Sequence, residues 1–530
     1  MSLNSHLALL STPENIEVLS NIVRGIEKEG LRVDPRGYLA TTPHPKTLGS
    51  ALTHPSITTD YSEALLEFIT APSSSIQQVL NELDEIHRFA YRQMGEELLW
   101  ISSMPCQLHA DSQVPIGQYG TSNIGRMKQV YRMGLGHRYG RAMQTIAGIH
   151  YNFSVPDDLW RLLQTNSQST QSLQDFKSEG YFGLIRNFRR YSWLLLYLLG
   201  AAPAVCKSFV ANRQHRLVPV GSDTHSLYRP HATSLRMGDL GYQSEAQGSL
   251  VISYNSLQQY LTTLHSALEK PYAAYDKIGL KDKHGNYRQL NTHLLQIENE
   301  FYSAIRPKRT TAAGETPLQA LERRGVEYIE VRCIDVNPLI PCGIDAETIR
   351  FLDTFLLFCL LSHSPQTNAQ EYARIPENLS RTVYEGRDPD LRLLRDGGEC
   401  ALRDWGSDLL NKMQPVAEKL DMAHRNKGSD NSYLHALAKM QTAIKDQRTT
   451  PSAILLAEMQ QNNETYFAMS MRKAWEQRRD FLARDLDPAT EIKYLALAEQ
   501  SQDRQADMEN NENLSFDEFL ANYWQSSHSN

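Results

Sequence analysis

Polar side chains occupy every second position in several segments of this chain whose other residues are mostly apolar. In the segment Ile26 to Leu31, the alternate residues Glu27 and Glu29 both carry carboxylates. Successive side chains of a β-strand point to opposite faces, so these two carboxylates lie on the same face. The pattern therefore predicts strands that bury one face and leave the other polar.

The same alternation returns in further segments. Their polar residues of shared parity are Gln144, His150, Asn152 and Ser154, then Gln296, Glu298 and Glu300, then Tyr328, Glu330 and Arg332. Asp60 and Glu67 accompany the strand-like segment Ala64 to Thr70. A single half-polar strand is also expected on the water-facing side of an antiparallel sheet. Several strands with short acidic residues fit that explanation less well, because a merely solvated face would favour Lys, Thr and Gln.

A face that gathers five or six carboxylates needs a neutralising cation. Carboxylates two residues apart lie about 7 Å apart along a strand. At an effective dielectric of about 20, their repulsion is roughly 2 kcal/mol. Oxygen ligands favour Mg²⁺ or Mn²⁺ over zinc, and the six cysteines include no CxxC pair that would indicate a usual zinc site. We therefore predict a Mg²⁺ site, with Mn²⁺ as the alternative ion.

Basic residues accompany the acidic segments. Arg306, Lys308 and Arg309 form a compact group of cations, which suits phosphate oxygens but is equally typical of a solvated surface turn. Arg332 shares its strand face with Glu330, so we expect it in the same cleft as the metal ligands. The chain contains no GxxxxGK[ST], no GxSxG and no correctly spaced GxGxxG. Phosphoryl transfer here would therefore depend on metal ions and arginines.

Composition limits the partners and the compartment. The net charge of −7 argues against nucleic acid as a partner, because nucleic-acid-binding domains usually carry a basic excess. The longest apolar run, Tyr191 to Cys206, contains Pro203 and is shorter than the about 20 residues that span a bilayer. The N-terminus lacks the charged and apolar regions of a signal peptide. Scattered cysteines are typical of reduced cytosolic proteins, so we expect a cytoplasmic protein without membrane contact.

Helical periodicity is clearest in the segments Ser74 to Met94, Tyr181 to Leu199 and Ala346 to Leu361. Beyond about residue 365 the chain is charged and helix-prone. Ser515 to Glu518 has the pattern of a capping box and predicts the start of a last short helix. The polar stretch Ser501 to Asn513 is interpreted as a linker.

Six runs of sequence follow one another in the order of a known family. They are RGIEKEGLRV from Arg24, LGSALTHPSITTDYSEALLEFIT from Leu48, QYGTSNIGRMKQVYRMGLGHRYGRAMQTIAGIHYNFS from Gln118, ATSLRMGDLGY from Ala232, LQIENEFYSAIRPKR from Leu295 and GVEYIEVRCIDVNP from Gly325. Together they cover most of residues 20 to 345, and they resemble the bacterial-type glutamate–cysteine ligases of the type 1 family. Beyond about residue 365 the resemblance is much looser.

The resemblance implies a fold and a division of the chain. The implied fold class is α+β, with an antiparallel sheet that forms an active-site cleft backed by helices, as in glutamine synthetase, and with a mainly helical C-terminal part. Residues 1–365 would form the catalytic α+β region, and residues 366–530 a mostly helical region packed on it. A monomer is expected.

The resemblance also implies an activity and its residues. Members of the family bind glutamate, cysteine and MgATP. ATP phosphorylates the γ-carboxylate of glutamate, and the cysteine amine attacks the acyl phosphate in the first step of glutathione biosynthesis. The positions that match the family's metal ligands are Glu27, Glu29, Asp60, Glu67, His150 and Glu330. Those that match its contacts to substrates and phosphates are Gln144 and Asn152 at glutamate, Arg236 at the cysteine carboxylate, Tyr61, Tyr242 and Tyr302 at the thiol pocket, Arg132, Lys308 and Arg309 at ATP, and the catalytic pair Arg332 and Glu330.

Three other functions fit part of the same pattern. One is a related carboxylate–amine ligase with a different amine substrate. A two-metal phosphohydrolase would also use His150 and the acidic strands, but would not need Arg236 and Arg332 as a pair of carboxylate clamps. A catalytically inactive metal-binding regulator is opposed by the intact acidic set. The glutamate–cysteine ligase is therefore the favoured interpretation.

Overall fold

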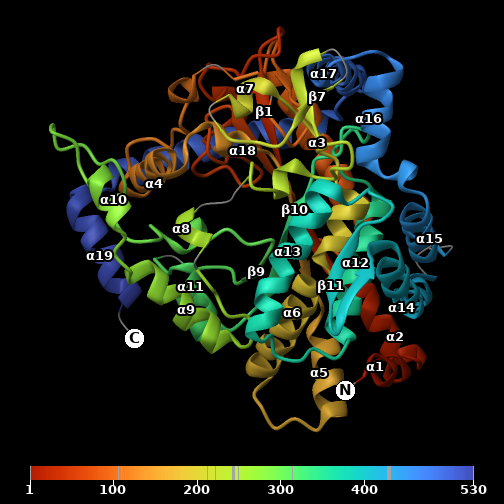
Figure 1. The fold of residues 1–530 in the computed structure, drawn as a ribbon. Helices are drawn as coiled ribbons and strands as arrows, with labels where there is room; N and C mark the ends of the chain where they lie inside the picture. Colours follow the sequence, from red (N-terminus) through yellow and green to blue (C-terminus); the bar gives the residue numbers. More distant parts are fainter. Residues whose placement is uncertain are drawn as a thin grey trace.

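The computed structural model describes residues 2–105, 107–108, 110–211, 213–220, 223–241, 245–248, 250–312, 314–425 and 431–528. Strands and helices are interspersed through the first two thirds of the chain, and helices dominate after residue 345. Figure 1 shows the helices packed around the strands. The predicted α+β class is confirmed.

The centre of the fold is an antiparallel sheet of seven strands. Its order is β2-β3-β1-β5-β10-β9, and β4 pairs with the end of β1. Its strands are β1 (Val23–Val33), β2 (Ile57–Thr59), β3 (Leu65–Ile69), β4 (Leu98–Leu99), β5 (Ile149–Ser154), β9 (Ile305–Lys308) and β10 (Tyr328–Ile334). The register places Glu27 of β1 opposite His150 of β5, and Glu29 opposite Glu67 of β3. Polar residues from distant segments therefore meet on one face.

The other face of this sheet is apolar and covered by helices. Helix α3 (Ile76–Gln93) contacts β1, and α6 (Leu173–Leu199) contacts β9 and β10. Helix α12 (Ala346–Leu361) packs on α6, and its Asp353 accepts a 2.6 Å hydrogen bond from the Tyr151 hydroxyl of β5. Fully buried side chains of these strands include Ile26, Tyr151, Phe153, Ile329 and Val331. This alternation of buried and polar residues agrees with the strand parity read from the sequence.

The three strongest helix predictions are confirmed in type, and one begins earlier than expected. Helix α3 covers the predicted segment within two residues at its start, and α12 has the predicted bounds. Helix α6 extends to Leu173, eight residues before Tyr181, because Ser172 caps it by accepting a hydrogen bond from the Asp175 amide. Its first two turns carry several polar, exposed residues, which hid them from the apolar periodicity.

Beyond residue 365 the chain is mostly helical, as predicted. Its elements are α13 (Ala369–Glu385), β11 (Arg392–Arg395), β12 (Gly398–Ala401), α14 (Leu402–His424), α15 (Ser432–Lys445), α16 (Pro451–Gln461), α17 (Tyr466–Ala483), α18 (Pro488–Asn510) and α19 (Phe516–His528). Helix α14 contacts α2 (Pro13–Glu17), and α17 contacts α3. The division at residue 365 itself stays a prediction.

The C-terminal end of the chain differs from the expected linker. Helix α18 continues through most of Ser501 to Asn513, so the linker prediction is wrong. The Ser501 hydroxyl accepts a 2.8 Å hydrogen bond from the Ser50 amide, and Gln502 donates one of 2.6 Å to the Lys46 carbonyl. The polar residues of this stretch therefore include some that form hydrogen bonds to the segment from Lys46 to Ser50. The predicted capping box is present, with reciprocal bonds between Ser515 and Glu518.

The remaining elements complete the frame around the sheet. They are α1 (Leu3–Leu9), α2 (Pro13–Glu17), α4 (Asn123–Tyr139), α5 (Asp157–Ser167), β6 (Ala204–Cys206), α7 (Lys207–Val210), β7 (Val218–Val220), β8 (Asp223–Tyr228), α8 (Glu245–Gly248), α9 (Leu257–Glu269), α10 (Ala273–Ile278) and α11 (Pro317–Arg324). Within the described residues, none of the helices combines the length and the apolar character needed to cross a membrane.

Candidate active site

A cavity of about 560 Å³ opens on the polar face of the sheet. Its floor is formed by β1, β3, β5 and β10, its walls by α4 and by the segment from residue 297 to 317. All six residues predicted as metal ligands line it, namely Glu27, Glu29, Asp60, Glu67, His150 and Glu330. The structure thus brings the acidic residues of four strand segments together.

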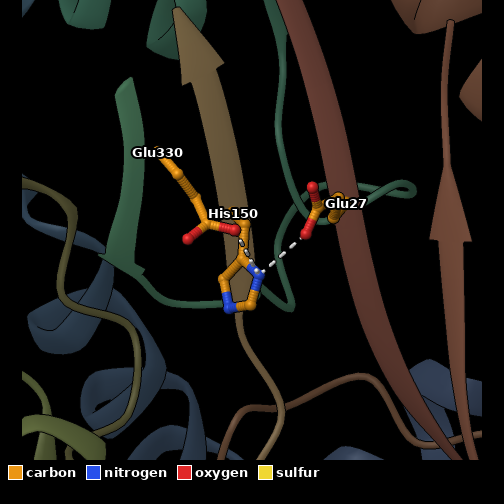
Figure 2. Close-up of side chains that lie close together, drawn as sticks. All are labelled: Glu27, His150 and Glu330. Atoms are coloured by element: carbon orange, nitrogen blue, oxygen red, sulfur yellow. Dashed lines mark hydrogen bonds and ion pairs between the residues drawn. The ribbon is translucent and has the colours of Figure 1, made fainter. Parts of the chain in front are cut away.

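Three of these side chains converge most closely (Figure 2). His150 Nδ1 lies 3.1 Å from Oε2 of Glu27 and 3.9 Å from Oε1 of Glu330. One ligand atom from each residue lies within 4.8 Å of the others. The three residues stand on the neighbouring strands β1, β5 and β10, so the spacing of paired strands sets their separation. This geometry could hold a metal ion.

A second acidic group lies beside the first. Glu29 Oε1 is 3.7 Å from His150 Nε2, on the opposite side of the imidazole from Glu27. Burial raises the pKa of the Glu29 carboxyl, and the neighbouring Asp60 adds to the effect. Burial also raises the pKa of Glu67 well above its usual range, with further repulsion from Glu27, Asp60 and Glu29. The protein therefore supplies too little positive charge to neutralise these carboxylates.

At Glu330, by contrast, cations of the protein neutralise the carboxylate. Burial alone would raise its pKa, but the cations Lys308 and Arg332 hold it well below the usual range. Lys308 Nζ lies 3.4 Å from Oε1 and Arg332 Nη1 lies 3.2 Å from Oε2 of this carboxylate. Cations of the protein therefore neutralise one side of the cavity and leave the Glu29–Glu67 side negative. That remaining charge fits a hard divalent cation held by oxygen ligands.

The three predicted cations Arg306, Lys308 and Arg309 do not all face the cavity. Arg306 and Lys308 share one face of β9 and line the cavity. Arg309 follows with opposite parity, does not line the cavity, and donates a 2.7 Å hydrogen bond to the Arg324 carbonyl. The role of Arg309 at the phosphates therefore stays a prediction, without support from the lining of the cavity. Arg132 of α4 does line the cavity, and its guanidinium donates to the Asp60 carbonyl and lies 4.5 Å from the Tyr119 ring centroid.

The residues predicted for glutamate and the thiol pocket are placed in different ways. Tyr61, Gln144 and Tyr302 line the cavity. Asn152 lies behind Glu27 and donates a 2.9 Å hydrogen bond to its Oε1. Tyr242 lies outside the described residues. Gln144 belongs to a short 3-10 helix, Ala142–Thr145, rather than to the strand that its parity suggested.

Arg236 lies below the cavity rather than on the surface. It is 2% exposed and does not line the cavity. Its Nη2 donates a 2.8 Å hydrogen bond to the Arg332 carbonyl, and its Nη1 is 3.8 Å from Asp335. A side chain at Gly148 would collide with the guanidinium, since a Cβ there would lie 2.0 Å from Nη2. Arg236 thus supports the strand that carries Arg332 and lies close to the site.

Sequence reasoning assigned a single residue, Arg132, on the α4 wall of the cavity and missed the others. Residues of α4 line it at helical spacing, namely Ile124, Met127, Lys128, Tyr131, Arg132 and Leu135. Burial lowers the pKa of Lys128 to about 8, with the nearby Arg132 contributing. The i, i+3, i+4 spacing is visible in the sequence. It was not recognised because cations within an apolar helical face resemble an ordinary amphipathic helix.

The segment Gln296 to Glu300 is also different from the prediction. It forms the 3-10 helix Glu298–Glu300 rather than a strand. The buried Glu300 carboxylate accepts a 2.9 Å hydrogen bond from Arg138 and a 2.6 Å bond from the Tyr139 hydroxyl. Its charge is thus matched within the protein. The period-two pattern there did not indicate a strand face.

The fold and the cavity define an enzyme site for anionic substrates. Carboxylates and a histidine that could hold a cation line the same cavity as Arg332, Lys308 and Arg132, whose side chains could hold phosphate or carboxylate oxygens. This combination on an antiparallel sheet is typical of metal-dependent phosphoryl transfer rather than of nucleophilic catalysis by a side chain.

Comparison with known proteins specifies the family. The glutamate–cysteine ligase family model matches residues 7–382. The glutamate–cysteine ligase of Alcanivorax borkumensis is 51% identical over 526 residues, which cover 98% of this chain and 99% of that one. That of Saccharophagus degradans is 49% identical over 523 residues, 98% of each chain. The crystal structure of glutamate–cysteine ligase from Francisella tularensis in complex with AMP matches with a TM-score of 0.89 at 38% identity, over 96% of this chain and 98% of that one. This chain belongs to the glutamate–cysteine ligase family.

Proposed function

We propose that this chain joins the γ-carboxylate of L-glutamate to the amine of L-cysteine, with ATP activating the glutamate as a γ-glutamyl phosphate. The observation that carries the proposal is the convergence of a carboxylate–histidine cluster with Arg332 and Lys308 on one cavity, in a member of this family. An amide bond cannot form from a free carboxylate without activation, and an anionic carboxylate repels an anionic nucleotide. A cavity that holds both a cation and arginines meets both requirements.

The acidic side chains would hold Mg²⁺. Glu27, His150 and Glu330 form one set of donors, and Glu29, Asp60 and Glu67 line the cavity beside it. Carboxylate oxygens dominate this set, and Mg²⁺ or Mn²⁺ prefers such ligands. When bound, the ion would neutralise charge on the phosphates and on the reacting carboxylate.

Arg332 is proposed as the residue that stabilises the transferred phosphoryl group. Its backbone amide donates a 2.8 Å hydrogen bond to the Ala304 carbonyl, so the side chain projects from a fixed strand. Its planar guanidinium can hold two oxygens at once. Lys308 would hold phosphate oxygens from β9, and Arg132 would do so from α4 across the cavity.

The two amino-acid substrates are proposed to lie deeper in the cavity. Gln144 would bind glutamate, and Asn152 would orient Glu27 by the hydrogen bond already present. Tyr61 and Tyr302, which line the cavity, would form part of the thiol pocket. Arg236 stands behind this wall, since its Nη1 is 3.3 Å from the Met237 sulfur, which itself lies 3.2 Å from the Tyr302 hydroxyl. From this position Arg236 is proposed to bind the cysteine carboxylate.

Incubation with glutamate, cysteine and MgATP tests the function. Mass detection should find γ-glutamylcysteine and ADP in equal amounts, and omission of any one substrate should abolish both. A panel of other amines in place of cysteine would test the thiol pocket. ADP without the dipeptide would instead indicate a phosphohydrolase and contradict the proposal.

We infer that the enzyme acts as a monomer in the cytoplasm. The proposed substrates, ATP and a reduced thiol amino acid, belong to that reducing compartment. Light scattering coupled to size-exclusion chromatography should give the mass of one chain, 60.3 kDa, and a dimer mass would contradict the monomer.

A further inference from the structure

Tyr119 lies in the loop that precedes α4, buried behind the α4 wall of the catalytic cavity rather than lining it. Its side chain is 1% exposed. The first turn of α4 packs closely on the backbone of this loop, since a Cβ at Gly125 would lie 2.2 Å from the Tyr119 carbonyl oxygen. The glycine permits an approach that brings the Tyr119 ring to side chains of the following turns.

The ring of Tyr119 contacts two cations of the cavity wall. Lys128 Nζ lies 5.3 Å and Arg132 Cζ lies 4.5 Å from the ring centroid. Both cations line the cavity, and like charges four residues apart on a helix repel each other. An aromatic ring attracts cations at these distances. The ring therefore offsets the repulsion that would otherwise separate the two side chains.

The hydroxyl of Tyr119 contacts the segment that carries a predicted metal ligand. It donates to the carbonyls of Thr59 and Asp60, at 2.8 and 2.9 Å, and accepts a 3.0 Å hydrogen bond from the Thr59 hydroxyl. Arg132 Nε donates to the same Asp60 carbonyl, and Asp60 lines the cavity. One buried tyrosine thus connects the backbone of Asp60 with the two cations of α4.

We propose that Tyr119 is a positioning residue of the active site, whose ring fixes Lys128 and Arg132 for an oxyanion and whose hydroxyl fixes Asp60 for the metal ion. The inference rests on the proposed function, which supplies the phosphate oxygens and Mg²⁺. The ring and the hydroxyl act on different partners. Substitutions can therefore separate their effects.

Tyr119→Phe keeps the ring and removes the hydroxyl, whereas Tyr119→Leu removes both. Isothermal titration of the full chain with inorganic pyrophosphate, at saturating Mg²⁺, reports on the cations of α4. Tyr119→Leu should weaken pyrophosphate binding roughly 3- to 30-fold, the range expected for loss of a buried cation–π contact. Tyr119→Phe should stay within about twofold of wild type.

Titration with Mg²⁺ alone reports on the hydroxyl. Both Tyr119 variants should bind Mg²⁺ about 2- to 12-fold more weakly than wild type, the effect of one lost hydrogen bond behind a ligand. Tyr181→Leu is the matched control, because it removes an equally buried tyrosine of α6 that does not line the cavity. Its affinities for both probes should match wild type.

A double-mutant cycle tests whether the ring acts through Lys128. Lys128→Met removes the charge and keeps a long side chain. When it is combined with Tyr119→Leu, the loss of pyrophosphate affinity should be smaller than the product of the two single losses.

Three results would overturn the proposal. They are independent losses in the cycle, equal losses of pyrophosphate binding in the two Tyr119 variants, and unchanged Mg²⁺ binding in Tyr119→Phe. If Tyr119→Leu does not fold, Tyr119→Phe and Lys128→Met still decide, since unchanged Mg²⁺ binding in the first or unchanged pyrophosphate binding in the second would contradict the proposed role.

These outcomes are separable from the proposed function. Pyrophosphate and Mg²⁺ binding that depend on Tyr119, in an enzyme that forms no γ-glutamyl product, would support the positioning role and refute the function. Product formation combined with affinities that survive both Tyr119 substitutions would support the function and refute the positioning role.

Discussion

Two clusters of buried charge stand on the same strand, β1, and they are built in opposite ways. On the apolar face, Arg24 meets Asp353 at 2.8 Å, and Tyr151 donates a further hydrogen bond to that carboxylate. On the polar face, the buried Glu29 and the half-buried Glu67 lie among other carboxylates, and the pKa of each is raised by burial and by those neighbours. The charges of the first cluster are neutralised within the protein, whereas those of the second need a bound cation.

The first cluster is compatible with a stable fold, whereas the second reduces stability and is explained by function. A buried ion pair with matched hydrogen bonds is stable in place, although it adds little compared with apolar packing. A buried excess of one sign reduces stability, so it persists where binding or catalysis needs it. The following predictions test whether β1 divides its charges in this way.

The largest effect should come from breaking the complete pair. Asp353→Asn leaves Arg24 buried without a counter-charge, which should destabilise the fold by about 3–5 kcal/mol. Denaturant unfolding measures this loss. Asp396→Asn is the control, because it removes an ion-pair partner of Arg374 whose own side chain is 92% exposed. The free energy of unfolding should change little in this variant. Similar losses in both variants would contradict a special role for the buried pair.

Arg332→Lys should lower turnover nearly as strongly. Lysine cannot reproduce the planar fork that holds charge in the transition state, and loss of one such donor lowers kcat by about 10²- to 10³-fold. The KM values should change much less than kcat. Arg309→Ala is the matched control, because Arg309 turns away from the cavity. Near-normal turnover in Arg332→Lys would refute the proposed role.

Arg236→Ala should affect cysteine selectively. Loss of a hydrogen bond to a charged group costs about 1.5–3 kcal/mol, so kcat/KM for cysteine should fall roughly 10- to 150-fold. Cysteamine, which lacks the carboxylate, should be nearly indifferent, and the KM for ATP should stay close to wild type. Equal losses for cysteine and cysteamine would show that Arg236 only supports β10 through the Arg332 carbonyl.

Metal binding should release protons, which is the smallest effect expected. The pKa of Glu29 and that of Glu67 are raised, so these carboxyls keep protons at pH values where an exposed carboxyl is ionised. Metal ligation needs the carboxylate form. Mg²⁺ affinity should therefore fall as the pH is lowered towards the raised pKa values. Calorimetric titration with Mg²⁺ in two buffers of different ionisation enthalpy detects the released protons. Identical binding enthalpies in the two buffers would contradict the predicted proton release.

Strand parity predicted the floor of the site, while the walls could not be predicted in this way. Glu27, His150 and Glu330 were assigned to the polar faces of their strands because alternation in a strand is a local property. Their convergence on one site was predicted from this parity together with the family resemblance. Which face of α4 meets the cavity depends on packing between distant elements, so Lys128 was missed. Parity also explains why Arg309 does not line the cavity, since it follows Lys308, the last residue of β9, with the opposite parity.

The most direct test of this account is the thermal unfolding of wild type and Glu67→Gln at pH 8, with and without Mg²⁺. The raised pKa of Glu67 means that its ionisation destabilises the folded state as pH rises above the unfolded value, and glutamine avoids this cost. Without Mg²⁺, Glu67→Gln should therefore have the higher Tm. Mg²⁺ should raise the Tm of wild type by more than that of the variant, which keeps the other acidic residues of the cavity. A lower Tm for the variant without Mg²⁺, or no increase in the wild-type Tm with it, would contradict the claim that the acidic face is kept for a metal ion.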